Sequence, residues 1–196
     1  ARKSSDLNLE SNAYNPLSGI YLKQDKPEQA MEMIRKSVSI KEKTGDVRGL
    51  AFAIYGRAKV LMFMKQYEEA EKDLLRSMDI HDEMGERLGV GMAYNKLGVL
   101  YLSMGRLNEA EAVLKKGLDF SREFNIVMIQ FKCHYLLYRV SKEKGDVQES
   151  LRHLEKYLEE KEAVINTQTL KVIENYDLIS QVREMEREAK LQKEKE

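Results

Sequence analysis

The chain has 196 residues, of which 42% are hydrophobic and 34% charged, and its 33 basic side chains balance 33 acidic ones. A net charge of zero, without a basic stripe interleaved with aromatics, argues against nucleic acid as a partner. No apolar stretch approaches the ~20 residues that a membrane-spanning helix needs, which argues against a membrane partner. The single cysteine, Cys133, excludes an internal disulfide and suits a reducing compartment, so we expect a cytoplasmic chain.

One pattern recurs along the chain at a spacing of forty residues, without insertion or deletion. Its copies read LSGIYLKQDKPEQAMEMIRKSV, RAKVLMFMKQYEEAEKDLLRSM and LGVLYLSMGRLNEAEAVLKKGL, beginning at Leu17, Arg57 and Leu97. Within each copy, small and apolar residues recur at spacings of three and four on both sides of a short break, which predicts two helices joined by a tight turn. With few prolines and abundant Glu, Lys, Leu, Ala and Met, the composition also favours an all-α fold.

The repeat is anchored on a column of small residues, namely Ala30, Ala70, Ala110 and Ser150. Two antiparallel helices approach closely only where their side chains are small, so we expect this column at a helix crossing. A single helix pair cannot bury both of its faces, and the units must therefore stack to share one core. Gly or Asn between units, at positions 45, 85 and 125, is suited to the left-handed turn that ends a helix.

This register divides the chain into three parts. Residues 1–12 read as the tail of a preceding repeat, because residues 1–4 align with the segment that closes the second helix of the first unit. Residues 13–161 hold four units, at about 13–46, 47–86, 87–126 and 127–161. Residues 162–196 form a long C-terminal helix. We therefore expect the repeats to extend upstream of the first residue.

The C-terminal helix carries a thin apolar stripe, formed by Val172, Tyr176, Ile179, Val182, Met185 and Ala189. The stripe fits a two-stranded coiled coil, and hence a homodimer. Two interpretations stay open at this stage. One is a frayed helix that caps the array, and the other is a linker helix that leads to a further domain.

The segment YNKLGVLYLSMGRLNEAEAVLKKGL carries the pattern small-x2-Leu-small-x2-Tyr, followed by Ala-x3-Leu-x2-small. It resembles the tetratricopeptide repeat, in the long variety with a period of forty residues. The resemblance implies a right-handed α-solenoid of antiparallel helix pairs with a long C-terminal helix. An array that ends in YLEEKEAVINTQTLKVIENY is also similar to the sensory part of certain bacterial signalling proteins.

No motif of catalysis or metal binding is found in the sequence. The histidines His81, His134 and His153 lie in different columns of the repeat and form no metal-binding spacing, and Cys133 has no second sulfur ligand. Cys133 shares a column with three alanines and reads as a small core residue. The glycine-rich segment Gly89–Gly98 does not match a phosphate loop and fits the first helix of the third unit. We therefore expect neither an enzyme nor a bound cofactor or metal.

The first helices of such a stack line its concave surface. The residues that the packing columns leave free there are the predicted binding residues: Asn15, Phe52, Tyr55, Lys59, Met62, Met92, Asn95, Lys132, Tyr135 and Arg139. In peptide-binding members of the family that the sequence resembles, Asn at the matching position pairs with an extended peptide. Lysine and arginine suit carboxylates, and Phe and Met offer an apolar floor.

Pro16 leaves two readings of the first helix. Either Asn15 caps a shortened helix with Pro16 in its first turn, or the helix continues through Pro16 and kinks.

The concave groove has two candidate occupants. One is a partner chain, and the other is the C-terminal helix of this chain.

Two functions from different classes of binding protein follow. The first is a non-enzymatic protein–protein interaction module, the sensory or scaffolding part of a larger bacterial signalling protein, which docks a peptide or partner helix on its concave face. The alternative is a free-standing adaptor or co-chaperone-like clamp that binds acidic peptide tails.

Overall fold

The computed structural model describes residues 2–193, with side chains described for residues 7–172 and for four positions beyond. These residues form α-helices joined by tight turns, and they contain no strand. The helices are α1 (Arg2–Lys23), α2 (Pro27–Thr44), α3 (Val47–Phe63), α4 (Tyr67–Glu83), α5 (Arg87–Ser103), α6 (Leu107–Glu123), α7 (Val127–Lys144) and α8 (Val147–Lys193). From α3 on, each helix begins twenty residues after the preceding one.

A residue in the left-handed conformation stands at every junction between helices. These residues are Asp25, Gly45, Lys65, Gly85, Gly105, Asn125 and Gly145, with φ between 52° and 79°. Glycine adopts this conformation without steric cost, whereas Lys65 does so at a cost of about 1–2 kcal/mol. The spacing of the turns fixes the spacing of the helices, and each chain reversal makes neighbouring helices antiparallel.

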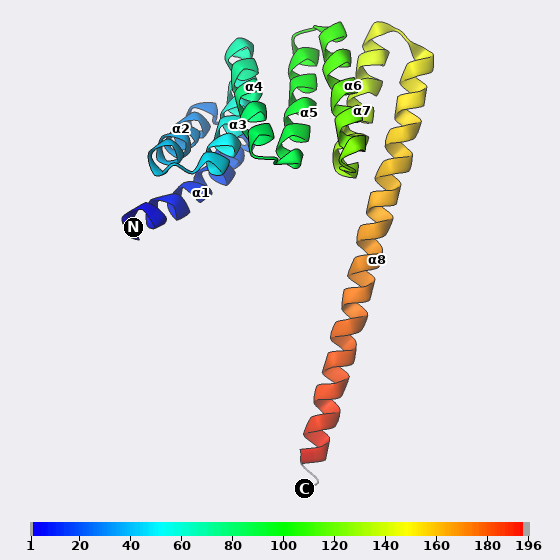
Figure 1. Cartoon of the computed structure of the whole chain (residues 1–196). Coiled ribbons are helices and arrows are strands. Elements are labelled where there is room, and N and C mark those ends of the chain that lie inside the picture. The colour runs from blue at the N-terminus through cyan, green and yellow to red at the C-terminus, as the bar shows by residue number, and fades with distance from the viewer. Residues whose placement is uncertain (1, 194–196) are drawn as a thin grey trace.

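The helices stack side by side into an open array, from which α8 projects far beyond its neighbours (Figure 1). Each helix packs on the next one in sequence, and α1, α3, α5 and α7 also contact one another across the pairs. Among the described residues, the even-numbered helices do not pack against each other, although the side chain of Arg76 in α4 reaches Glu42 of α2 at 3.7 Å. The odd-numbered helices therefore line the shorter, concave side of the stack. The fold is an all-α helical-repeat solenoid, as the sequence predicts.

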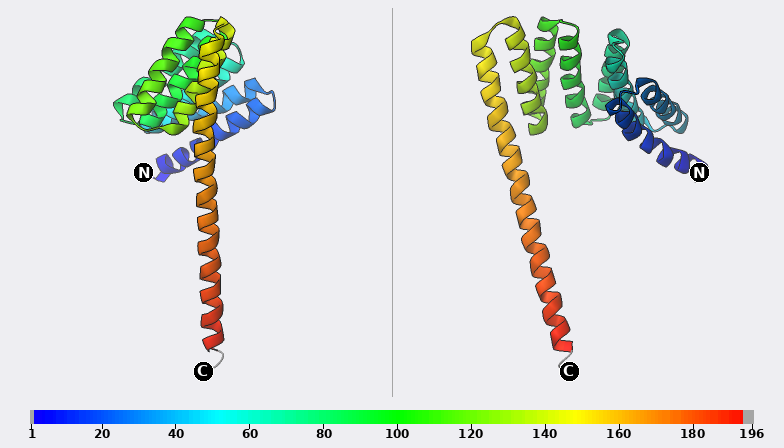
Figure 2. Two further views of the ribbon diagram at one scale, coloured as in Figure 1. Left: turned by 90° about the vertical axis from the view of Figure 1, so that its right-hand side faces the viewer. Right: turned by 180° about the vertical axis from the view of Figure 1, so that it is seen from behind.

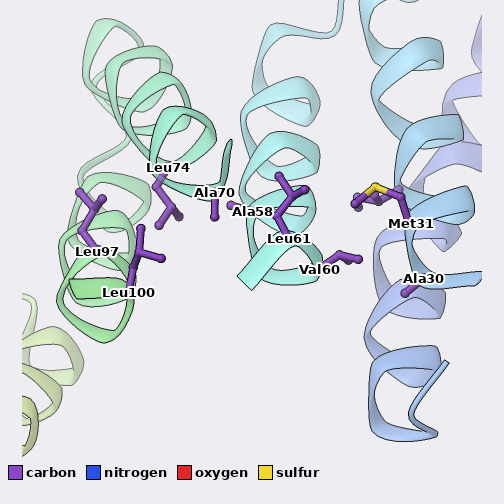
Figure 3. Close-up of a cluster of buried hydrophobic side chains, with 10 residues drawn as sticks. Ala30, Met31, Ala58, Val60, Leu61, Ala70, Leu74, Leu97 and Leu100 are labelled. Carbon is purple, nitrogen blue, oxygen red and sulfur yellow. The ribbon is translucent and has the colours of Figure 1, made fainter. Parts of the chain in front are cut away.

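The buried hydrophobic side chains form three clusters along the stack, and Figure 3 shows one of them. The anchor alanines Ala30, Ala70 and Ala110 are fully buried. The close approach of helices is clearest at Gly98 of α5, where an added Cβ would stand 2.3 Å from Cδ2 of Leu114 in α6. Small residues are required at these crossings because the neighbouring helix occupies the space.

From Arg2 on, the predicted lead-in of residues 1–12 lies in the same helix as the start of the first unit, and its assignment to a preceding repeat stays a prediction. Helix α1 runs from Arg2 to Lys23 without interruption, and Pro16 lies inside it. Asn15 therefore does not cap a shortened helix. The four-unit division remains a prediction, because it was set by the sequence register alone.

The last helix, α8, is continuous over 47 residues. Among the residues that the structure describes, it packs against α7 and no other helix. Two views from different sides show its C-terminal part leading away from the stack (Figure 2). The described part of α8 beyond its contact with α7 does not fold back into the concave groove, which leaves the groove open. From the predicted stripe, Tyr176, Ile179, Val182, Met185 and Ala189 have side chains outside the described residues.

Within residues 2–193, no helix is both long enough and apolar enough to cross a membrane.

Candidate functional site

The concave side of the stack carries a pocket of about 670 Å³ between α3, α5, α7 and the first part of α8. This volume lies within the range usual for ligand-binding sites. The residues that line the pocket are Tyr55, Leu88, Met92, Asn95, Lys96, Val99, Met128, Ile129, Phe131, Lys132, Tyr135, Leu136 and Tyr157. Most of them are apolar or aromatic, with a few polar groups among them.

Half of the predicted binding residues line this pocket, namely Tyr55, Met92, Asn95, Lys132 and Tyr135. The other five lie elsewhere. Phe52 packs edge-on against His81 of α4, with ring centroids 4.6 Å apart, and Met62 packs against the core. Lys59 and Arg139 are exposed outside the pocket lining, and Asn15 lies in α1 near Gly56.

Asn95 is the most unusual polar group of the pocket. Its side chain is only 8% exposed, and its Oδ1 accepts a hydrogen bond from Cys133 Sγ at 2.9 Å. The amide nitrogen Nδ2 is buried and has no hydrogen-bond partner among the described residues. Because an unpaired buried donor costs about 1–3 kcal/mol, Asn95 is a group that gains from an acceptor brought by a ligand.

Lys96 adds a positive charge beside Asn95. Partial burial lowers the pKa of Lys96, and repulsion from the ammonium groups of Lys59 and Lys132 lowers it further. None of these three lysines forms an ion pair within the described residues, whereas Arg57, Arg106 and Lys115 on other surfaces are paired with carboxylates. The three lysines come from α3, α5 and α7, so the stacking of the repeats gathers their charge on one side of the groove.

An aromatic wall closes the pocket at its C-terminal end. The ring of Tyr157 from α8 lies 5.1 Å from that of Tyr135 and 6.2 Å from that of Phe131, measured between centroids. At the opposite end, burial raises the pKa of Tyr55 to about 12. The pocket thus combines an apolar lining, a buried amide donor and positive charge.

Two of the pocket residues that lie outside the predicted set break a column of the repeat. Lys96 shares its column with Pro16, Gly56 and Leu136, and Tyr157 shares its column with Ser37, Ser77 and Gly117. A lysine among small or apolar residues, or a tyrosine among small ones, does not suit a packing position. The departure of Lys96 and Tyr157 from their columns is therefore the sequence signal by which these two pocket residues could have been found. Leu88, Met128, Ile129, Phe131 and Leu136 carry no signal that separates them from core residues.

A second group of polar side chains lies between α7 and α8. Nδ1 of His134 and Nδ1 of His153 are 2.9 Å apart, and both side chains are buried. Burial lowers the pKa of His134 to about 4 and also lowers that of His153. In the sequence these histidines stand in unrelated columns of the repeat, and the hairpin between α7 and α8 brings them together. Within the described residues, no cluster of three or more His, Cys, Asp or Glu side chains is placed to hold a metal ion.

A stack of antiparallel helix pairs with an open concave pocket defines a helical-repeat scaffold of the kind that binds other chains. Two tetratricopeptide repeat models match residues 11–44 and 50–123, together more than half of the chain. The chain belongs to the tetratricopeptide repeat family. No curated protein sequence matches it.

Solved structures with this fold share few residues with the chain. BtubC (BKLC) from P. vanneervenii is 19% identical with a TM-score of 0.70, and the match covers 81% of this chain and 65% of that one. The signal-transduction ATPase PH0952 from Pyrococcus horikoshii, which has a tetratricopeptide repeat sensor, is 18% identical with a TM-score of 0.72. The match covers 83% of this chain and 25% of that one. A Rap protein complexed with competence and sporulation factor is 16% identical with a TM-score of 0.72. The match covers 78% of this chain and 43% of that one.

These likenesses show the fold. In each of the three, the matched part spans less than two thirds of the solved chain.

Proposed function

We propose that the chain is a non-enzymatic protein-interaction module that binds a peptide in the concave pocket. The peptide carries apolar side chains for the lining of the pocket and a carboxylate for its lysines. The observation that carries the proposal is the buried, unpaired Nδ2 of Asn95 inside an open apolar pocket. A peptide carbonyl or carboxylate oxygen is the acceptor that this donor needs.

The charge of the groove favours an acidic ligand over a neutral one. Burial lowers the pKa of Lys96, and the positive charges of Lys59 and Lys132 lower it further. A carboxylate placed among them relieves this repulsion and accepts charge-assisted hydrogen bonds. This feature supports binding of acidic peptide tails, and it applies equally to a peptide segment with an Asp or Glu side chain.

We place the module in a larger signalling protein. The PH0952 ATPase, which has a tetratricopeptide repeat sensor, shares the fold over 25% of its chain, and α8 extends far past the stack (Figure 1). Tyr157 of α8 belongs to the lining of the pocket, so a bound peptide touches α7 and α8 together. Occupation of the pocket then changes the packing of α8 on α7, and a long stiff helix carries that change away from the array. A Rap protein that shares this fold over 43% of its chain is complexed with competence and sporulation factor, which supports a ligand as the input.

The experiment measures binding of an array of short immobilised peptides, synthesised with free and with amidated C-termini. Asn95→Leu replaces the amide by an apolar side chain with the same branching, and Lys96→Met removes the charge while keeping the apolar stem. We expect each variant to bind the selected peptides roughly tenfold more weakly, since a hydrogen bond to a charged group contributes about 1.5 kcal/mol or more.

The matched control is Lys116→Met, which removes an exposed lysine of α6 outside the pocket. It should leave affinity unchanged. Equal affinity of the wild type, Asn95→Leu and Lys96→Met for every selected peptide would show that the pocket is not the binding site. Comparison of the free and amidated peptides separates a terminal carboxylate from an acidic side chain.

A further inference from the structure

The exposed surface of α8 carries a row of large apolar side chains. Val147, Leu151, Leu158, Ile165 and Val172 are between 48% and 79% exposed. Helix α8 packs against α7 alone among the described helices, so no other part of the described chain covers the row. We call these five residues the α8 seam.

The seam has the spacing of a coiled coil. Leu151, Leu158, Ile165 and Val172 are spaced by seven and share one heptad position, a, and Val147 stands at the d position four residues before Leu151. The d positions that follow hold Leu154, Lys161 and Gln168. In a straight helix the seven-residue repeat drifts by about 20° per heptad, and a left-handed supercoil removes that drift. In sequence, the spacing of seven continues to Ile179.

The seam lies on a different face of α8 from the one that packs on α7. The α7 side of the helix carries His153, Tyr157 and Glu160, which are buried or half-buried. With about 100° of rotation per residue, the seam lies roughly 100–140° around the helix from these residues. Helix α8 can therefore keep its contact with α7 while a second helix occupies the seam.

The repeat itself shows that this face accepts a helix. Leu118 of α6, forty residues before Leu158, is 5% exposed and belongs to the core cluster that joins α6 to α7. Leu158 is 53% exposed. The position that α7 covers on α6 is thus uncovered on α8.

The length of the seam selects its occupant. A repeat helix of 17 residues such as α6 spans about 26 Å, whereas the seam from Val147 to Val172 spans about 38 Å. Within the described chain, α8 is the helix long enough to cover it. We infer that the seam pairs with the α8 seam of a second copy of this chain, as a parallel, in-register two-stranded coiled coil.

A parallel arrangement is favoured by the residues of the seam. In register, Leu151, Leu158, Ile165 and Val172 each face the same apolar residue of the partner copy. Lys161 and Gln168 at d then face their own copies, which weakens the dimer but leaves the apolar a layers intact. An antiparallel pairing of the same heptads would instead set Leu158 and Ile165 in layers with Gln168 and Lys161. The dimer begins inside the last helix pair of the array, upstream of the stripe that the sequence analysis singled out, and it holds the two concave pockets at a fixed spacing.

Sedimentation equilibrium of the full chain tests the inference. We expect a mass of twice 22.8 kDa at high micromolar concentration, and the monomer mass for the double variant Leu158→Glu/Ile165→Glu. The matched control is Leu170→Glu, which changes a leucine that is 60% exposed on another face of α8 and should leave the dimer intact. Circular dichroism checks that each variant keeps its helices.

Cross-linking tests the orientation. The Leu158→Cys variant, in which the native Cys133 is buried, should form a disulfide between copies under mild oxidation. A wild type that stays monomeric at every concentration, or a Leu158→Glu/Ile165→Glu variant that stays dimeric, overturns the inference. A dimer without the cross-link overturns the parallel register. Peptide binding is measured separately, so failure of the dimer leaves the proposed pocket untouched.

Discussion

Acidification should weaken the packing of α8 on α7 through the buried pair His134 and His153. A hydrogen bond between the two Nδ1 atoms, 2.9 Å apart, requires one of them to carry a proton and the other to be free of it. A proton on the accepting Nδ1 places two N–H groups face to face and breaks this bond. Around them stand Glu149, Arg152, Lys156 and Glu160 from α8, and Glu111, Lys115 and Arg122 from α6.

The direction and the size of the stability change with pH follow from the pKa of His134. Burial first, and the neighbouring positive groups second, lower it from 6.5 to about 4 in the folded chain. The unfolded chain therefore takes up the proton at higher pH than the folded chain. Stability is complete above the unfolded pKa, falls as the pH drops from 6.5 toward 4, and then levels off. A difference of this size corresponds to about 3 kcal/mol in total, and to about 2.5 kcal/mol between pH 7 and pH 4.5.

Urea unfolding of the wild type and of His134→Leu/His153→Leu, at about pH 7 and about pH 4.5, measures this contribution. Burial also lowers the pKa of His81. That residue is present in both proteins, so its contribution to the pH dependence of stability cancels in the comparison. We expect the wild type to lose about 2.5 kcal/mol more than the double variant on acidification. Equal losses in the two proteins would refute the reasoning.

Three substitutions test the packing and the turns. Gly98→Ala places a Cβ 2.3 Å from the buried Leu114, so we expect a loss of about 1–3 kcal/mol in urea unfolding, despite the better helix propensity of alanine. Lys65→Gly relieves a left-handed residue with φ of 60° and should raise the unfolding free energy by about 1 kcal/mol. Asp46→Ala removes the N-cap of α3 and the carboxylate partner of Lys41, whose side chain is 4% exposed, and should cost about 2–4 kcal/mol.

Each of these has a matched control. Gly19→Ala in α1 adds a Cβ with nothing within 4 Å and should stabilise the helix slightly. Gly105→Lys puts a lysine at the left-handed position of the equivalent turn in the next pair, which is the opposite change to Lys65→Gly. It should lower the unfolding free energy by a similar amount. Asp146→Ala removes an exposed carboxylate that caps α8, with no buried lysine beside it, and should cost only about 1 kcal/mol. If any control behaves like its test variant, the structural cause given above is wrong.

The sequence by itself determined the helix-pair stack. The pattern of small and apolar residues has the period of a helix, and its repetition every forty residues leaves stacking as the way to bury it. The left-handed turns are also local features, which is why Gly45, Gly85 and Asn125 could be placed without coordinates. The concave column of Tyr55 and Asn95 followed from the same register.

Only the tertiary structure decided the features that depend on distant side chains. Arg57 breaks a column of leucines, and its charge is neutralised by Asp73 of α4, at 2.6 Å and 2.7 Å. The burial of Lys96 also depends on neighbouring helices, and the contact between His134 and His153 depends on how α7 and α8 face each other. A periodic pattern fixes which face of a helix is buried. The partner of each side chain is fixed by how the helices cross, and no local pattern contains that information.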